Sequence, residues 1–452
     1  MSMGYYLNDL AVWAASREPV MVAQPKDIKE VQRIVRWANE RGEPLIPVSS
    51  GIHFYGATIP DNGGLIVDLS KMKGIEVDQR NRCINIEPGV RWGPLQMEAN
   101  KYGLRVLNPL LPHAESSALT SILEREPPLV WKSEYGERII ALEVVLPNGD
   151  IFRTGSWAVK QSAFELGHVV PYGPGLNWHW LFQGAQGTLG IITKMRIRAY
   201  PIPSLQRLLF ITSSNLEEIV EATYALGKMM VGYECFILNN LYLASILAAS
   251  NENLGKIREK LPAWVLLICL SAMYWFPKEK ISYEEEAIAE RGIEAKLTLP
   301  ELPEANKVLL PLLSRVWEKE PYWRFRWKGR NQPLPFITSL SMLQKHLDTL
   351  HEILLMRNYP FEDIGVYVQP LEYGRAAYCE LGFHYDPSRD KEKSIVKELI
   401  FDACTRLAKE GAFFNRPYGP MANLIDASYK KLLRQVKSIF DPNNIMNPGK
   451  VV

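Results

Sequence analysis

A loop of small and polar residues at positions 47–60 is the first segment of the chain that could do chemistry. It follows the apolar run Leu45–Val48, which predicts a strand, and it carries Ser49, Ser50 and Gly51. Small residues let a backbone turn tightly and aim successive N–H groups at an anion such as a pyrophosphate. The loop has neither the Gly-Lys-Ser/Thr of a P-loop nor a Rossmann glycine motif, so it is either a binding loop or an ordinary turn.

Three further segments have a similar composition. Residues 87–90 (Glu-Pro-Gly-Val) end a predicted strand, residues 112–121 are small and polar, and residues 181–194 hold a glycine-rich turn that leads into another strand. Four such segments at strand edges in one part of the chain indicate either one extended ligand or four unrelated turns.

The composition excludes several classes of protein. The chain has 452 residues, a net charge of +2 and 47% apolar residues, which is ordinary for a globular protein of two or three domains and offers no basic surface for nucleic acid. The five cysteines are dispersed without a Cys-x-x-Cys pair, which argues against a disulfide scaffold, a zinc site or an iron–sulfur cluster, so we expect no metal.

The chain carries no signal for export or for a membrane. Its first residues lack the basic and apolar regions of a signal peptide, and the most apolar run, 263–276, is too short to span a bilayer. That run predicts a buried strand or helix. We therefore expect a cytoplasmic protein with no membrane span.

The elements that must position the four segments follow from hydrophobic periodicity. Residues 25–38 predict a helix between Pro25 and Gly42, and Asn148-Gly149 predicts a hairpin turn. From about 204 to 410 the pattern changes to strands that alternate with longer amphipathic helices, typical of a sheet covered by helices. The turn-rich end of the chain, 439–450, predicts a poor core element. Strands are predicted at 45–48, 65–69, 83–86, 139–146, 151–153, 190–198, 208–212, 264–270, 365–369 and 377–383, and helices at 216–227, 278–291, 340–356 and 390–409.

Several longer motifs resemble the FAD-linked vanillyl-alcohol oxidase and p-cresol methylhydroxylase superfamily. The order and spacing of these motifs are hard to obtain by chance. They are Ile-Glu-Pro-Gly-Val at 86–90, Val-Leu-Pro-Asn-Gly-Asp-Ile-Phe-Arg-Thr-Gly at 145–155, Pro-Tyr-Gly-Pro-Gly at 171–175, Gly-Ile-Ile-Thr-Lys at 190–194 and Asp-Pro-Asn-Asn-Ile-Met-Asn-Pro-Gly-Lys at 441–450.

The resemblance implies an α+β protein with a two-domain FAD-binding fold. A PCMH-type FAD-binding domain would span 1–203, with the C-terminal tail 412–452 returning to it, and an α/β cap or substrate domain would span 204–411. The residues that the resemblance assigns to FAD are Val48, Ser49, Ser50, Gly51, Ile52, His53, Phe54, Gly56, Pro88, Gly89, Val90, Pro112, Ser116, Ser117, Thr120, Gly187, Gly190, Ile191, Ile192, Asn447 and Lys450.

Two branches of the superfamily compete as models for the substrate. Tyr55 before a glycine, and Arg416, match the branch that oxidises para-substituted phenols, although Asn415 replaces the tyrosine expected next to that arginine. The segments 112–118 and 184–190 look more like the branch of 2-hydroxy-acid (glycolate and D-lactate) dehydrogenases, but the His-x-Gly-Asp-Gly-Asn motif of that branch is absent. We expect the phenol branch, with the hydroxy-acid branch as the alternative.

The phenol branch implies hydride transfer from a benzylic carbon to N5 of the flavin. An arginine and a tyrosine hydroxyl can hold the substrate oxygen as a phenolate, because a charge-assisted pair favours the ionised form. Arg416 and Tyr55 take this role by resemblance, with Asn415 beside them, and His113 is the candidate general base. Each of Tyr55, Arg416 and His113 could instead have only a structural role.

The resemblance also raises the question of how FAD is attached. Arg375 stands where a covalently attached histidine is expected, Tyr378 and His384 are not aligned, and His53 is one position from another known attachment point. We expect noncovalent FAD, with His53 as the alternative. A noncovalent flavin would suit an electron-acceptor protein, such as a cytochrome or another subunit, and we expect a homo- or hetero-oligomer.

Two segments depart from the family pattern. Residues 123–131 (Leu-Glu-Arg-Glu-Pro-Pro-Leu-Val-Trp) replace a glycine-rich run and predict a reshaped pocket. Residues 322–327 alternate aromatic and basic side chains, which predicts a strand with either an aromatic face toward the pocket or a solvated basic face. Asn415 and the segment 123–128 leave a further alternative open, a flavin-bearing or flavin-free subunit for electron transfer or assembly that lacks substrate chemistry of its own.

Overall fold

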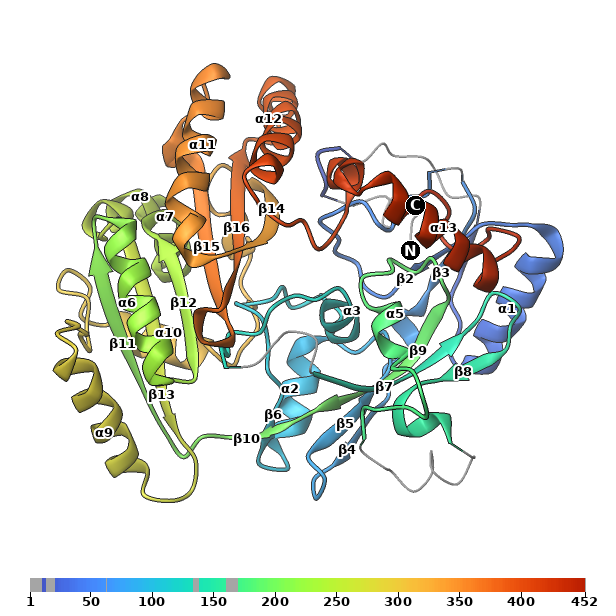
Figure 1. Ribbon diagram of the computed structural model, residues 1–452, viewed down its shortest axis with the longest axis horizontal. Coiled ribbons are helices and arrows are strands. Elements are labelled where there is room, and N and C mark those ends of the chain that lie inside the picture. Colours follow the sequence, from blue (N-terminus) through green and yellow to red (C-terminus); the bar gives the residue numbers. More distant parts are fainter. Residues whose placement is uncertain (1–9, 14–20, 62, 133–137, 160–169, 452) are drawn as a thin grey trace.

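The computed structural model describes residues 10–13, 21–61, 63–132, 138–159 and 170–451. The segment that bears on the signal-peptide expectation, residues 1–9, lies outside them. Figure 1 shows one half of the molecule built on a six-stranded sheet, and a second half that holds the two other large sheets and helix α13 near the end of the chain. Among the described residues no helix is both long and apolar enough to cross a membrane.

A parallel three-stranded sheet supports the first binding loop. Its order is β1-β3-β2, with β1 at Met21–Ala23, β3 at Leu65–Asp68 and β2 at Leu45–Val48. Helix α1 (Ile28–Arg41) buries one face against this sheet and ends at Gly42, whose φ of 64° is the left-handed conformation that glycine tolerates.

The C-terminal tail joins this sheet. Met446 forms a bridge with Leu45, and both Ile445 and Met446 are fully buried. Asp441 accepts hydrogen bonds from their two backbone N–H groups and from Lys437, which satisfies the tail's polar groups. The prediction that this turn-rich segment is a poor core element is therefore wrong.

A five-stranded sheet with the order β4-β5-β9-β7-β8 forms the rest of this half. Its strands β7 and β8 form the predicted hairpin, where Gly149 has a φ of 82°. The elements of this part are β4 (Ile75–Asp78), β5 (Cys83–Ile86), β7 (Ile139–Val145), β8 (Ile151–Arg153), β9 (Ile191–Arg198), α2 (Trp92–Asn100), α3 (Ala118–Leu123), α5 (His179–Phe182) and the small pair β6 (Leu104–Arg105) and β10 (Tyr200–Pro201).

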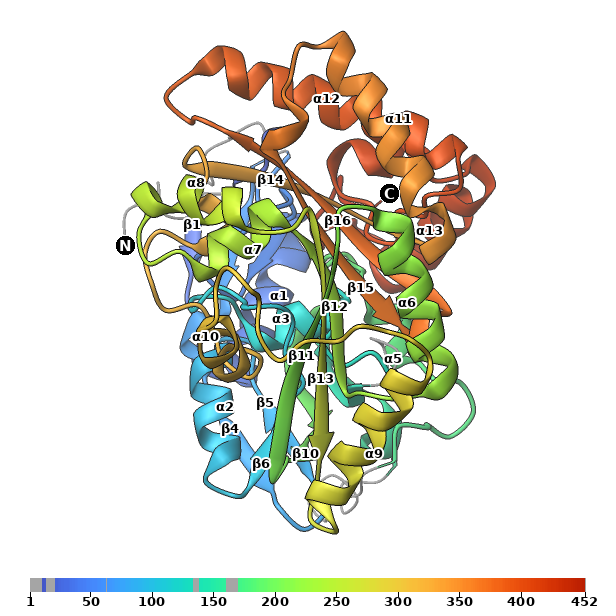
Figure 2. The same cartoon turned by 90° about the vertical axis from the view of Figure 1, so that its left-hand side faces the viewer.

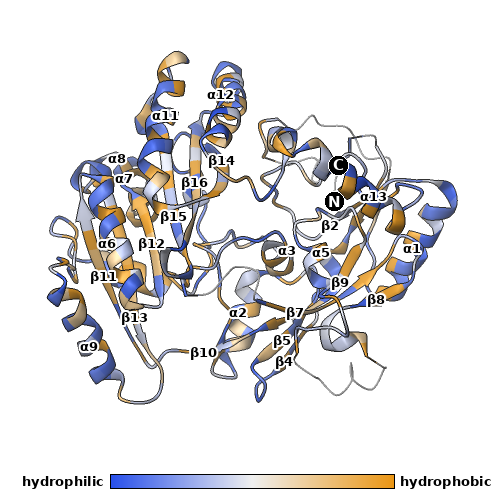
Figure 3. Ribbon diagram, viewed as in Figure 1, coloured by the Kyte–Doolittle hydropathy of each residue, from blue (hydrophilic) through white to orange (hydrophobic). Residues whose placement is uncertain are grey.

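The other half is an antiparallel sheet with the order β11-β13-β12-β15-β16-β14. Both faces of the sheet are covered, so alternate residues of each strand enter two separate cores. Figure 3 shows hydrophobic residues concentrated along these strands, whereas helix α9 at the outer edge is largely hydrophilic. The strands are β11 (Leu205–Ser213), β12 (Glu234–Asn239), β13 (Trp264–Ala272), β14 (Arg330–Thr338), β15 (Ile364–Leu371) and β16 (Ala376–Tyr385).

Helices cover this sheet in two layers. Figure 2 shows α6 and α9 on one side of the sheet and α7 and α10 on the other. The helices are α6 (Leu216–Met229), α7 (Asn240–Leu247), α8 (Asn251–Lys260), α9 (Pro277–Glu290), α10 (Ala305–Leu312), α11 (Leu343–Met356), α12 (Asp390–Lys409) and, after the chain returns to the first half, α13 (Ala427–Phe440). This arrangement confirms the α+β fold, while the exact domain boundaries at 203 and 411 stay a prediction.

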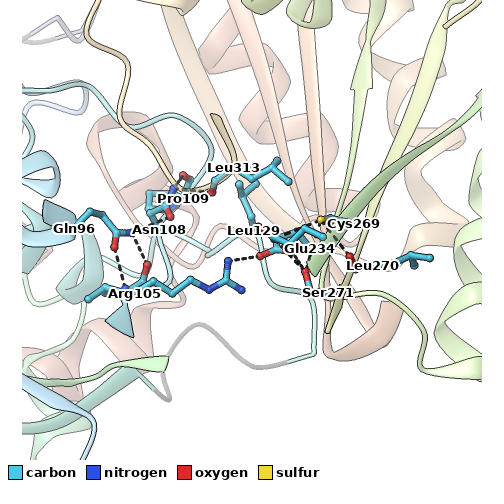
Figure 4. A network of polar contacts seen from close by, with 12 residues as sticks. Gln96, Arg105, Asn108, Pro109, Leu129, Glu234, Cys269, Leu270, Ser271 and Leu313 are labelled. Atoms are coloured by element: carbon cyan, nitrogen blue, oxygen red, sulfur yellow. Dashed lines mark hydrogen bonds and ion pairs between the residues drawn. The ribbon is translucent and has the colours of Figure 1, made fainter. Parts of the chain in front are cut away.

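A buried polar network joins the two halves (Figure 4). Arg105 Nη1 of β6 lies 2.8 Å from Glu234 Oε1 of β12, and both side chains are almost completely buried. Asn108 Nδ2 donates to the carbonyl of Leu313, and Val130 forms a bridge with Glu234. These contacts hold the six-stranded sheet against the loops that follow α2 and α3.

One predicted element is wrong and several were missed. Residues 322–327 are not a strand but contain the short 3₁₀ helix Trp323–Phe325, because Arg324 is buried in an ion pair with Glu380 rather than solvated. The missed elements are β1, β4, β6, β10, β12, β14, α2, α3, α5, α7, α8, α10 and α13. The apolar run 263–276 supplies β13, in which every residue is buried.

Candidate active site

A deep cavity lies where the predicted binding segments and the C-terminal tail meet. Its space, together with the open solvent at its mouth, amounts to about 1200 Å³. Residues from all four segments predicted from the sequence line it, together with Arg416, Tyr418 and Asn447. The predicted FAD residues in its wall are Val48, Ser49, Ser50, Ile52, His53, Phe54, Pro88, Ser116, Ser117, Thr120, Gly187, Gly190, Ile191, Ile192 and Asn447.

Hydroxyl groups tie the segments of this first cavity together. Ser49 Oγ lies 2.6 Å from Thr120 Oγ1, and Ser117 Oγ donates to the carbonyl of Pro88 and accepts from the N–H of Thr120. Ser117 is the N-cap of α3, which explains why a serine ends the loop there. The loops at 49–52, 87–90 and 116–121 are thus held as one wall.

Two glycines bring backbone close to this wall. Gly187 has a φ of 73°, and a Cβ atom there would lie 2.5 Å from Cγ of Pro47. Gly190 has a φ of 153°, and its Cβ would lie 2.8 Å from both Val144 Cγ1 and the carbonyl oxygen of Val145. Any side chain at either position would push the loop out of its place.

Some predicted FAD residues do not line the first cavity. Gly51, Gly56, Gly89 and Val90 belong to the loops that form it but are absent from its wall. Pro112 lines a second cavity instead.

The two polar residues predicted in the tail behave differently. Lys450 forms an ion pair with Asp61 at 3.0 Å and is absent from the wall. Asn447 lines the cavity and donates through Nδ2 to the carbonyls of Ala57 and Gln186, while its Oδ1 is buried without a partner among the described residues.

The second cavity adjoins the first and shares Phe54, Tyr55, Ser116 and Glu126 with it. It lies between the loops of the first half and one face of the six-stranded sheet. The other lining residues are Pro109, Leu110, Pro112, His113, Pro127, Tyr322, Arg324, Pro333, Tyr367, Tyr378 and Glu380.

Arg416 and Tyr55 meet at the boundary of the two cavities, as the sequence predicts. The guanidinium carbon of Arg416 lies 5.2 Å from the centre of the Tyr55 ring, and Arg416 is buried. The Tyr55 ring also stacks on Tyr418 at 4.7 Å. Burial raises the pKa of Tyr55 even though Arg416 opposes the shift, so the Tyr55 hydroxyl stays protonated. Its Oη forms no hydrogen bond with the residues that the structure describes.

A chain of hydrogen bonds continues from Arg416 along the wall of the second cavity. Arg416 Nη2 donates to Tyr378 Oη at 2.9 Å, and the Tyr378 hydroxyl donates to Glu380 Oε2 at 3.0 Å. Tyr378 and Glu380 share a face of β16 because they are two residues apart in a strand.

The chain ends on Arg324 and Tyr322. Arg324 Nε donates to Glu380 Oε1 at 2.8 Å, and its Nη1 donates to Tyr322 Oη at 2.7 Å. Burial alone would lower the pKa of Arg324, but Glu380 outweighs it and holds that pKa well above its usual value. Burial raises the pKa of Tyr322 to about 12, and its hydroxyl donates to the carbonyl of Leu111. Two arginines therefore lie at opposite ends of one buried network.

His113 faces the second cavity rather than the first. Its Nδ1 accepts the backbone N–H of Glu115 at 3.1 Å, and its ring packs edge-on against Tyr322. Burial lowers the pKa of His113, although Glu320 at 3.7 Å from Nε2 opposes the shift. A neutral imidazole with Nδ1 engaged as an acceptor carries its proton on Nε2.

Asn415 does not join the cluster of Tyr55 and Arg416. Its neighbour Arg416 lines the first cavity, whereas Asn415 lines a third cavity together with Arg125 and Gln183. The side chain is 6% exposed, and neither amide atom has a partner among the described residues. The structure thus places Asn415 in a different cavity from Tyr55 and Arg416, and its assignment to the substrate site stays a prediction.

The loop at 123–131 reaches both cavities. Leu123, Glu124 and Glu126 line the first, and Glu126 and Pro127 line the second. Glu124 accepts a hydrogen bond from the Tyr418 hydroxyl, and burial raises the pKa of Glu124. The loop that departs from the family pattern thus supplies two carboxyl groups to the site.

The residues considered for covalent attachment have different surroundings. Arg375 is exposed and pairs with Glu372, and His384 is fully buried against Asn331, where burial lowers its pKa to about 4. Tyr378 lines the second cavity, and His53 lines the first. The described residues contain no group of three or more potential metal-ligating side chains.

Sequence reasoning missed Glu380, Arg324, Glu126 and Tyr418 as site residues, and it considered Tyr378 only for attachment. The predicted strand 377–383 already placed Tyr378 and Glu380 on one face, which is a usable signal. The sequence held no comparable signal for Arg324, because the chain around it forms a turn.

Comparisons with known proteins agree with this fold. Residues 19–155 match the FAD binding domain model, and residues 421–451 match the model of the C-terminal domain of FAD linked oxidases. The flavoprotein subunit of 4-cresol dehydrogenase (hydroxylating) from Pseudomonas putida is 30% identical, with 96% of this chain and 88% of that protein covered. The mitochondrial D-lactate dehydrogenase (cytochrome) of Arabidopsis thaliana is 24% identical, with 96% and 73% covered.

The solved structures agree on the fold. 4-Ethylphenol oxidase from Gulosibacter chungangensis, in complex with isoeugenol, has a TM-score of 0.84 at 19% identity, with 99% of this chain and 92% of that chain covered. The molecule is thus a two-domain FAD-linked oxidoreductase. The chain belongs to the vanillyl-alcohol oxidase and p-cresol methylhydroxylase family, as its motifs predict.

The first cavity fits FAD by its chemistry. It offers serine and threonine hydroxyls from three loops, small glycine turns where backbone closes the wall, and apolar residues such as Leu189 and Ile191. The buried Asn447 Oδ1 and Arg416 Nε are polar atoms in residues of the same wall that lack protein partners among the described residues. Hydroxyls and backbone amides suit a pyrophosphate, and apolar walls suit the ring systems.

Proposed function

We propose that this enzyme oxidises a para-substituted phenol, or a related aromatic compound, at its benzylic carbon. The observation that carries the proposal is the buried Arg416, which lies against the rings of Tyr55 and Tyr378 where the two cavities meet. FAD, held by the residues of the first cavity, would supply the acceptor for the hydride.

Arg416 and Tyr55 together can hold a phenolic oxygen in its ionised form. Arg416 contributes a positive charge at a buried position, where charge-assisted hydrogen bonds are strong. Tyr55 contributes a protonated hydroxyl, because burial raises its pKa. An ionised oxygen pushes electrons through the ring and weakens the benzylic C–H bond, so holding the phenolate is the chemical task of this pair.

His113 would act at the other end of the substrate. It faces the second cavity, and burial keeps it neutral by lowering its pKa. In the tautomer with its proton on Nε2, Nδ1 is the basic nitrogen, so His113 would take a proton from water or from a benzylic hydroxyl group by releasing the N–H of Glu115. We propose His113 as this general base.

A second candidate function is oxidation of a 2-hydroxy acid. Arg324 and His113 face the same cavity, and an arginine with a neutral histidine suits a carboxylate next to a hydroxyl group. The similarity to a D-lactate dehydrogenase supports this candidate as well. Because Arg324 is already paired with Glu380, whereas Tyr55 Oη is not engaged, the phenol remains the preferred substrate.

We also propose that FAD is bound noncovalently and that electrons pass to a protein acceptor, such as a cytochrome or another subunit of a homo- or hetero-oligomer. Arg375, at the expected attachment position, has no nucleophilic atom and is exposed. Acid precipitation tests the attachment, since noncovalent FAD stays in the supernatant. Colour in the pellet would point to His53, which is the histidine in the wall of the first cavity.

Anaerobic mixing tests the substrate. The holoenzyme is mixed with 4-ethylphenol, with D-lactate or with glycolate, and bleaching of the flavin absorbance is followed. Reduction by 4-ethylphenol alone supports the phenol, and reduction by D-lactate or glycolate alone would replace it with the second candidate.

A further inference from the structure

We propose that Tyr378 and Glu380 form a relay that removes the proton from the phenolic oxygen of the substrate. This inference rests on the proposed function, since it concerns the oxygen that Arg416 and Tyr55 would hold. It assigns the missing hydroxyl of the site to Tyr378, because Asn415 lines a different cavity.

The geometry gives the relay a direction. The Tyr378 hydroxyl accepts from Arg416 Nη2 at 2.9 Å and donates its own proton to Glu380 Oε2 at 3.0 Å. A hydroxyl oxygen has two acceptor positions, so one remains after Arg416 is satisfied. Tyr378 and Tyr55 line the same cavity, and Arg416 contacts both rings, so a substrate oxygen held by Tyr55 and Arg416 would lie near the Tyr378 hydroxyl.

The proton transfer is balanced in bonds and in charge. The substrate O–H bond breaks as a new O–H bond forms on Tyr378, and the original Tyr378 proton moves to Glu380 Oε2. Tyr378 ends as the neutral phenol it was, Glu380 becomes a neutral acid, and the substrate becomes a phenolate. The negative charge therefore moves from beside Arg324 to beside Arg416, and the buried site gains no net charge.

Conservation of net charge lowers the cost of the relay, and the charge of Arg416 beside the new phenolate has to offset the weak basicity of a carboxylate such as that of Glu380. Creating a new charge in a buried site is costly, whereas moving one between two arginines replaces one ion pair by another. Burial raises the pKa of Tyr378, which prevents the tyrosine from keeping a negative charge and passes that charge on. Glu380 itself lines the second cavity, so its proton can leave to a water molecule there.

Tyr378→Phe and Glu380→Gln test the relay in the holoenzyme. Tyr378→Phe removes the hydroxyl, and Glu380→Gln keeps an oxygen that can accept the hydrogen bond but not the proton. Tyr359→Phe is the matched control, because Tyr359 is buried and its hydroxyl donates to the carbonyl of His384, outside the two cavities. Flavin reduction is measured with 4-ethylphenol and with its more acidic 2,6-difluoro derivative, at constant FAD content.

If the relay operates, its variants should reduce flavin more slowly with the weakly acidic phenol than with the more acidic one. With 4-ethylphenol near pH 7, both relay variants should reduce flavin about a hundredfold more slowly than wild type, the scale of general-base catalysis. The difluoro substrate, of which a far larger fraction is ionised at that pH, should restore most of the rate, and raising the pH should do the same for 4-ethylphenol. Tyr359→Phe should match wild type with both substrates.

Other outcomes overturn the relay. An equal loss with both phenols would mean that Tyr378 and Glu380 only shape the cavity, and unchanged rates would mean that the proton leaves by another route. If neither phenol reduces the flavin of the wild-type enzyme, the proposed function itself fails and the relay with it. Reduction of the wild type with unaffected variants removes the relay alone.

Discussion

Replacing Arg416 is the most direct test of the proposed substrate site. Arg416 is buried, its guanidinium donates to Tyr378 Oη at 2.9 Å, and it lies over the rings of Tyr55 and Tyr378 at 5.2 and 5.6 Å. A hydrogen bond to a charged group contributes about 1.5–3 kcal/mol. If that contribution is made to the phenolate in the transition state, Arg416→Ala should slow flavin reduction by roughly 10- to 150-fold, at 1.36 kcal/mol per tenfold change.

Arg416→Lys separates charge from geometry. Lysine keeps the positive charge but not the planar fork of donors, so we expect a loss smaller than that of Arg416→Ala. Stopped-flow reduction of the holoenzyme by 4-ethylphenol measures the rate and the apparent dissociation constant, and FAD content and thermal unfolding show whether the fold is retained. An Arg416→Ala enzyme that keeps its FAD and reduces at the wild-type rate would refute the assignment of Arg416 to the substrate oxygen.

Three further predictions concern the cofactor wall, the contact between the halves and pH. Gly187→Ala should weaken FAD binding at least tenfold in a fluorescence titration, because the new Cβ would lie 2.5 Å from Cγ of Pro47. Gly42→Ala is the control and should leave the affinity unchanged, because Gly42 has a similar φ but open space around it. Equal FAD affinities for the two variants would contradict the close approach at Gly187. Arg105→Met should lower the free energy of unfolding, measured by urea denaturation, by about 3–5 kcal/mol, because it leaves Glu234 buried without its partner. Adding Glu234→Leu should recover most of that loss. Losses that simply add in the double variant would argue against the ion pair. Burial lowers the pKa of His384 to about 4 in the folded state, below the unfolded value of about 6.5, so the unfolded state binds more protons and the free energy of unfolding should fall as pH falls from about 6.5, by up to about 3 kcal/mol at pH 4. The His384→Gln variant should lose less stability over the same pH range. An unchanged slope of stability against pH in that variant would exclude His384 as the source.

The strands of the fold were predictable where a single local pattern decides the structure. Residues 45–48 and 83–86 are short apolar runs next to turn residues, and both are strands in the structure. Residues 234–239 are a strand as well, yet this segment was missed. Its first residue, Glu234, is a buried carboxylate whose partner Arg105 is distant in the sequence, and such a pair leaves no periodic signal.

The same distinction between local and tertiary signals explains which site residues could be predicted. Glycine- and serine-rich loops after strands are visible in a sequence, so most residues of the first cavity were predictable. The second cavity depends on side chains that only the tertiary structure brings together, because Arg324 comes from a turn and Glu380 from a strand. The family resemblance could not predict which cavity the Asn415 side chain faces. That direction depends on the path of the backbone where it leaves the six-stranded sheet.

The position of Arg416 explains why this site needs both halves of the molecule. Arg416 follows α12, just where the chain leaves the six-stranded sheet, and Tyr418 two residues later already contacts Glu124 of the other half. Tyr55 comes from the loop after β2, and Tyr378 from β16. The Arg416 guanidinium, which would stabilise the phenolate, is thus held between a loop of one half and a strand of the other. Any change that separates the halves, such as loss of the Arg105–Glu234 pair, should therefore weaken phenol-dependent reduction more than it weakens FAD binding, because the first cavity depends mainly on loops of one half.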